Sequence, residues 1–75
     1  MTDRTNAERR ADALETVRRY CEITEQDYNA DSLDAWVSDL LTDLFHLARA
    51  EDFSLEDRFA MAHTNYRAEL AEEET

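Results

Sequence analysis

The sequence contains no glycine, no proline and no lysine, and it has a single cysteine. Without glycine and proline the chain lacks the residues that form most tight turns, which argues against a fold of short strands and hairpins. It also lacks the glycine-rich loop of a phosphate-cradling site. The lone Cys21 cannot form an internal disulfide and lies among apolar positions, as expected of an inert core thiol. Ala, Leu, Glu and Arg dominate instead, which predicts an all-α fold.

The length of the chain is that of one small domain. Seventy-five residues bury a modest core, so we expect a single helical domain over residues 1–75. No apolar run is long enough to span a bilayer, and the first residues lack the apolar stretch of a signal peptide. We therefore expect a soluble, cytoplasmic protein without membrane contact.

The charge of the chain is strongly one-sided. Nineteen acidic residues stand against eight basic ones, all arginine, for a net charge of −11. After residue 20, three arginines stand against fifteen acidic residues, a net charge of −12. Such a surface disfavours direct binding to nucleic acid or anionic membranes. Three explanations stay open: a solvated surface suited to high salt or to a GC-rich genome, a surface for a basic protein partner, and imitation of the phosphates of a nucleic acid.

The spacing of apolar residues predicts three helices, over about 6–23, 32–50 and 55–71, in a three-helix antiparallel unit. Thr5 and Glu8 have the spacing of a capping box at the first helix. Ser54, with Asp57 three residues later, marks the start of the third. The acidic tail 71–75 should fray, because negative charge at a helix C-terminus opposes the macrodipole.

The second helix is expected to be the central element because its apolar face is unusually wide. The first helix offers an alanine-rich stripe and the third a narrow one, so neither can cover this face fully. We expect a two-fold homodimer through the second helix, although Tyr28 and the loops could close the gap within one chain. The predicted core and dimer residues are Leu33, Trp36, Val37, Leu40, Leu41, Leu44, Phe45, Phe59 and Tyr66.

Polar residues on the other side of the second helix allow two interpretations. Asp39, Asp43 and His46 lie at positions i, i+4 and i+7, and the last two have the i, i+3 spacing of carboxylate-bridged metal sites. The alternative is a solvated side in which His46 pairs with Asp43 and could also pair with Arg49. His63 and Tyr66 border the stripe of the third helix, where a packed, hydrogen-bonded histidine is expected. No serine, cysteine or aspartate stands near either histidine in a pattern typical of a nucleophile.

Residues 38–66, "SDLLTDLFHLARAEDFSLEDRFAMAHTNY", resemble short uncharacterised proteins of phages, prophages and plasmids. The shared pattern is DLLTDL-x-H followed by a terminal HY-x-x-E, with Thr64 and Asn65 departing from the strict His-Tyr pair. The resemblance implies a phage-like, mobile-element setting and implies no activity.

A second, partial resemblance is to the all-α nucleoside triphosphate pyrophosphohydrolases, whose Mg²⁺ sites use E-x-x-E on one helix and E-x-x-D on the next. Glu22 and Glu25 match the first pair. The second pair departs, because Asp39 has Thr42 at i+3 and Asp43 has Leu40 at i−3. This resemblance implies a Mg²⁺-dependent enzyme using Glu22, Glu25, Asp39 and Asp43.

We predict a non-enzymatic, acidic helical interaction protein that binds itself and a basic protein partner and needs no cofactor. It could act as an inhibitor or a nucleic-acid mimic. The alternative is a degenerate, Mg²⁺-dependent nucleotide pyrophosphohydrolase. The residues expected to meet the basic partner are Asp34, Asp39, Asp43, Glu51, Asp52, Glu56 and Asp57.

Overall fold

The structure is a computed structural model that describes residues 4–73. It has the α-helices α1 (Asn6–Ile23), α2 (Leu33–Ala50) and α3 (Leu55–Glu73), with the one-turn 3-10 helix η1 (Tyr28–Ala30) before α2. No strand occurs in this part of the chain, so the predicted all-α, three-helix fold is confirmed. The helix α3 extends two residues beyond the predicted end, and residues 74 and 75 of the expected frayed tail lie outside the described residues.

The helices begin at the side-chain caps that the sequence indicates. The Thr5 hydroxyl accepts from the backbone N–H of Glu8, and the Glu8 carboxylate accepts from the backbone N–H of Thr5, which completes the predicted capping box. Hydrogen bonding to the Glu8 carboxylate from the Thr5 backbone, and to a smaller extent from the Thr5 side chain, lowers the pKa of Glu8, because it favours the charged form. At α3 the Ser54 hydroxyl accepts from the N–H of Asp57 at 3.2 Å. The helix α2 starts after Ser32, whose side chain makes no capping bond.

Two helices end without the glycine that usually follows a helix C-terminus. After α1, the N–H of Gln26 donates to the carbonyl of Cys21 at 2.8 Å, and Glu25 has the left-handed φ of 57°. After α2, Phe53 donates to Ala48 at 3.0 Å, and Asp52 has φ 60°. Both arrangements are Schellman motifs. This conformation costs a residue with a Cβ about 1–2 kcal/mol, so the backbone is strained at Glu25 and at Asp52.

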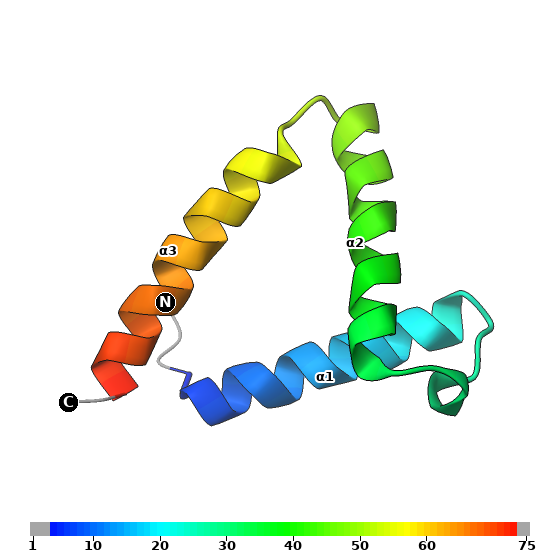
Figure 1. The fold of residues 1–75 in the computed structure, drawn as a ribbon, viewed down its shortest axis with the longest axis horizontal. Coiled ribbons are helices and arrows are strands. Elements are labelled where there is room, and N and C mark those ends of the chain that lie inside the picture. The colour runs from blue at the N-terminus through cyan, green and yellow to red at the C-terminus, as the bar shows by residue number, and fades with distance from the viewer. Residues whose placement is uncertain (1–3, 74–75) are drawn as a thin grey trace.

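The three helices form the sides of an open triangle (Figure 1). The beginning of α2 packs beside the C-terminal half of α1, α3 follows α2 at the opposite corner, and the C-terminal end of α3 returns towards the start of α1. Neighbouring helices therefore meet near their ends. This arrangement buries little side-chain surface along the middle of each helix.

The core is small and lies mainly where α1 meets α2. Val17, Cys21 and Trp36 form its buried cluster, with Tyr28 and Leu40 packed against it. The Trp36 indole N–H donates to the carbonyl of Tyr28 at 2.9 Å, which satisfies its polar atom. Burial raises the pKa of the Cys21 thiol, as expected for a core cysteine. The buried residues of the described chain are Val17, Cys21, Trp36, Ala48 and Leu55.

A polar contact closes the third corner of the triangle. The Asn6 side-chain amide donates to the backbone carbonyl of Glu69 at 3.1 Å and to the carboxylate of Glu73. The Arg9 guanidinium lies 3.1 Å from the Glu69 carboxylate. These contacts hold the C-terminal turn of α3 against α1. They explain why α3 extends beyond the predicted end despite its unfavourable terminal charges.

Candidate interaction surface

The apolar face of α2 remains largely open to solvent. Trp36 is buried, whereas Leu33 is 47% exposed and Phe45 is 42% exposed. Leu47, which also lies on this face, is 49% exposed. Tyr28 covers part of the face, as the single-chain alternative expected, but only around Trp36. Of the other predicted core and dimer residues, Leu40, Leu41 and Leu44 are half-buried, while Val37, Phe59 and Tyr66 are exposed.

The apolar stripe of α3 is even less covered, because every residue from 56 to 68 is exposed. Phe59 meets Phe45 of α2 edge-on, with ring centroids 5.8 Å apart. The open faces of α2 and α3 are therefore continuous at their shared corner. Tyr66 is 55% exposed and lies against the His63 ring at 6.1 Å. The expectation of a packed, hydrogen-bonded histidine is wrong for His63, since α3 contacts its neighbours only near its ends and leaves this position in solvent.

The surface of the whole chain shows how much remains uncovered. The chain exposes 6333 Å², whereas a compact protein of this mass exposes about 4,800 Å². Its radius of gyration is 14.3 Å, compared with about 11 Å for a compact domain of this length. The excess is about 1,500 Å², and a standard protein interface buries about 800 Å² per partner. The uncovered area is thus large enough for a stable interface.

The acidic residues predicted to meet a partner are all exposed, in three places. Asp34 lies in the first turn of α2, where the Ser32 side chain lowers the pKa of its carboxyl by hydrogen bonding. Asp39 and Asp43 lie on the polar side of α2. The remaining four lie in the connection between α2 and α3 or in the first turn of α3, and we call them the acidic corner: Glu51, Asp52, Glu56 and Asp57.

One of these carboxylates has a structural partner. The Tyr20 hydroxyl of α1 donates to the Asp43 carboxylate at 2.5 Å, which ties α1 to α2 beside the core. This bond, with a smaller contribution from desolvation, raises the pKa of Tyr20 to about 12. The predicted pairing of His46 with Asp43 is not among the hydrogen bonds and ion pairs of residues 4–73, where the Asp43 carboxylate accepts from Tyr20 instead. Asp43 is therefore less available to a partner than Asp39.

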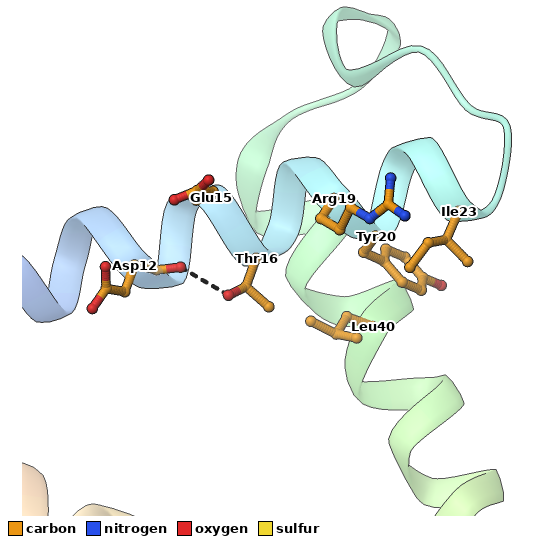
Figure 2. A pocket seen from close by; sticks show the side chains of 7 residues that line it. All are labelled: Asp12, Glu15, Thr16, Arg19, Tyr20, Ile23 and Leu40. Atoms are coloured by element: carbon orange, nitrogen blue, oxygen red, sulfur yellow. Dashed lines mark hydrogen bonds between the residues drawn. The ribbon is translucent and has the colours of Figure 1, made fainter.

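A shallow hollow lies beside this contact, where α1 crosses the start of α2 (Figure 2). Tyr20, Ile23 and Leu40 lie together at one end of it, and Asp12 and Glu15 lie at the other. Ile23 is 67% exposed there. The hollow offers apolar contact at one end and negative charge at the other, but no converging set of polar groups that would orient a small substrate.

The structure does not bring together the residues of the alternative metal sites. Among residues 4–73, no three His, Cys, Asp or Glu side chains come together in a way that could hold a metal ion. Glu22 forms an ion pair with Arg19 at 2.7 Å. Glu25 follows the end of α1 in the left-handed conformation, so it does not share the helix face that an E-x-x-E pair requires.

Two interactions beside the core were missed by the sequence reasoning. One is the Tyr20–Asp43 bond, and the other is the stacking of the Arg18 guanidinium over the Tyr28 ring at 5.1 Å. A tyrosine at the margin of an apolar stripe needs a polar partner for its hydroxyl, and this signal could have indicated the first contact. The second depends on the path of the connection, which has no periodic pattern.

The sequence matches no protein-family model, and no curated protein and no solved structure matches the chain. Within the described residues, none of the helices combines the length and the apolar character needed to cross a bilayer.

Proposed function

We propose that this protein is a non-enzymatic, acidic interaction protein that pairs with a second copy of itself and presents its carboxylates to a basic protein partner. The observation that carries the proposal is the uncovered surface: the chain exposes 6333 Å², about 1,500 Å² more than a compact protein of its mass. Apolar side chains contribute much of this surface along α2 and α3. Covering these side chains on association is favourable, because it removes apolar area from water.

The two kinds of surface fit two kinds of partner. The apolar face of α2 is continuous with α3 through the Phe45–Phe59 contact, so it suits a second copy with the same face. The acidic corner and Asp39 lie outside this face and attract positive charge, because the chain carries a net charge of −11. Such a surface can occupy a basic groove that otherwise holds phosphates.

The binding of a basic partner is tested by reversing two charges on the proposed surface and, as a control, two charges elsewhere on the chain. A double variant, Asp39→Lys with Glu51→Lys, alters the proposed surface and keeps both residues of the Tyr20–Asp43 bond. The control is a second double variant, Glu15→Lys with Glu25→Lys. It changes the net charge by the same amount, at one position on α1 and one just after it. None of the four side chains has a hydrogen bond or ion pair within residues 4–73, so all variants should melt within a few degrees of the natural chain.

The readout is affinity capture from a host extract at low and moderate ionic strength. We expect one or more basic proteins to be retained by the natural chain and by the Glu15/Glu25 variant, and to be lost with the Asp39/Glu51 variant. Retention should also fall with salt, because exposed charges are screened within about 10 Å at 0.1 M. Equal retention by all three chains, or equal loss from both variants, would refute a specific acidic surface.

A further inference from the structure

The helix α3 has a long apolar stripe that the rest of the chain covers only at its first turns. Leu55, Phe59, Ala62, Tyr66 and Leu70 recur at helical spacing along one side, and among them only Leu55 is buried. The rest of the chain touches this helix at its two ends, through Phe45 and through the polar contact with α1. The middle of a 19-residue helix is thus left without a packing partner.

The stripe is nearly symmetric about the midpoint between Ala62 and His63. Leu55 and Leu70 are equally distant from that point, and so are Phe59 and Tyr66. When two copies of such a helix run antiparallel about a two-fold axis through the midpoint, each Leu70 approaches the start of the other copy's stripe, where Leu55 stays buried within its own chain. Each Phe59 meets Tyr66 of the other copy. Large residues then face large ones towards the ends, and the small Ala62 lies at the crossing, where close approach is needed.

The charged residues beside the stripe form two pairs that are centred about one residue to either side of the same midpoint, with opposite signs facing each other. Glu56 and Arg67 are eleven residues apart, about three helical turns, so they lie on one edge of the stripe. Arg58 and Glu69 are also eleven residues apart and lie on the other edge. In the antiparallel arrangement Glu56 meets Arg67 of the second copy, and Arg58 meets Glu69 of the second copy. The two edges carry two arginines and two glutamates, whereas the chain as a whole has a net charge of −11.

We propose that α3 pairs antiparallel with α3 of a second copy, with the two-fold axis at Ala62 and His63. This inference rests on the self-association in the proposed function and assigns its register. A second copy fits better than a basic peptide, because the edges of the stripe are neutral in sum and self-complementary. Of the acidic corner, Glu56 alone lies on the edge of the stripe, and its other three residues remain for a basic partner. Arg67 is exposed and forms no hydrogen bond or ion pair within residues 4–73, so it is available to Glu56 of the other copy.

The Glu56–Arg67 pair provides the sharper test, because Glu69 already pairs with Arg9. Glu56→Arg and Arg67→Glu each replace an attraction by a repulsion at two places in the dimer, and we expect each to weaken association about tenfold. The double variant restores opposite charges and should return within about threefold of the natural chain. Within one helix these residues are about 16 Å apart, so rescue cannot arise inside one chain.

A matched control separates pairing from helix stability. Glu56→Arg also removes an acidic residue from the first turn of α3, where it favours the helix dipole. Asp57→Arg makes the same change in helix charge one residue later, on the side away from the stripe. It keeps the hydrogen bond from the Ser54 hydroxyl to the Glu56 carboxylate, which both chains carrying Glu56→Arg lack, so rescue in the double variant excludes loss of that bond as the cause. We therefore expect Asp57→Arg to leave the dissociation constant within about threefold of the natural value, measured by sedimentation equilibrium.

Cross-linking supplies a second readout that does not depend on charge. In the proposed register the two copies of residue 62 lie within about 10 Å of each other. The two copies of residue 68 lie on outward sides and about 16 Å apart along the helices. A short bis-maleimide should therefore join two chains carrying Ala62→Cys and leave Ala68→Cys chains single, since Cys21 is only 1% exposed.

The outcomes distinguish this inference from the proposed function. Charge rescue together with cross-linking at position 62 supports the α3 pair. If the dimer forms with the same dissociation constant in the Glu56 and Arg67 variants, or if chains cross-link as readily at position 68 as at position 62, the α3 pair is overturned. Self-association through α2 then still stands. A chain that stays monomeric overturns both.

Discussion

The Glu25→Gly substitution should stabilise the protein, because Glu25 occupies a backbone conformation that suits glycine. Its φ is 57°, and the N–H groups of Glu25 and Gln26 close the end of α1 by donating to Glu22 at 3.1 Å and to Cys21 at 2.8 Å. Glycine can keep both hydrogen bonds without the clash that a Cβ causes.

The magnitude follows from two opposing effects. A left-handed conformation costs a residue with a Cβ about 1–2 kcal/mol. Glycine avoids this cost, but it loses about 0.5–1 kcal/mol of stability because the unfolded chain has more conformational freedom at that position. The net gain in unfolding free energy should be about 0.5–1 kcal/mol, which for a domain of this size raises Tm by about 3–6 °C.

The assay is thermal and urea unfolding followed by circular dichroism at one fixed protein concentration, because self-association makes Tm concentration-dependent. Asp52→Gly at the end of α2 should gain less, since aspartate tolerates the left-handed region better than glutamate. Gln26→Gly is the matched control: its backbone has no positive φ, so it should lose stability. A loss with Glu25→Gly as large as that with Gln26→Gly would refute the reasoning.

Three further predictions concern the core, a cap and a tyrosine. Val17→Ala should cost about 2 kcal/mol, at about 0.8 kcal/mol per buried methylene plus the cavity left behind. Met61 is 53% exposed on the outer side of α3, so Met61→Ala should change the unfolding free energy in urea by no more than about 0.5 kcal/mol. Equal losses of stability in the Val17 and Met61 variants would contradict the assigned core. Thr5→Ala should cost about 1 kcal/mol in urea unfolding by breaking the capping box, and an unchanged midpoint would show that the cap contributes nothing. The Tyr20 pKa is raised from 10.0 to about 12, so its contribution to stability is complete below pH 10 and is lost as the pH rises from 10 to 12. Ultraviolet titration should therefore show one late tyrosine that returns towards its ordinary pKa in Asp43→Asn, and simultaneous titration of all three tyrosines would argue against the bond.

The helices and their caps could be predicted from the sequence because their causes are local. The Thr5 and Glu8 capping box and the Ser54 cap depend on residues within one turn, and the structure contains both. The end of α3 could not be predicted in this way. It is held by Asn6, more than sixty residues away, and a local pattern carries no information about such a contact.

The arrangement of the helices also lies beyond a periodic pattern. Periodicity showed that the apolar face of α2 is wide, but the same face could serve a closed bundle or an open triangle. The choice depends on the connections, which place Tyr28 under Trp36 and turn α3 away from α2 after Asp52. For the candidate site, the sequence located the acidic residues but not the Tyr20 bond that occupies Asp43, because that bond joins two helices.

The most direct test of the account is the mass of the natural chain in solution, measured by sedimentation equilibrium at moderate ionic strength over a wide concentration range. Moderate salt screens the repulsion between two chains that each carry a net charge of −11. We predict a reversible dimer with twice the mass of the 75-residue chain. A folded monomer that persists at the highest concentration, with its α2 and α3 faces open to water, would contradict the central claim.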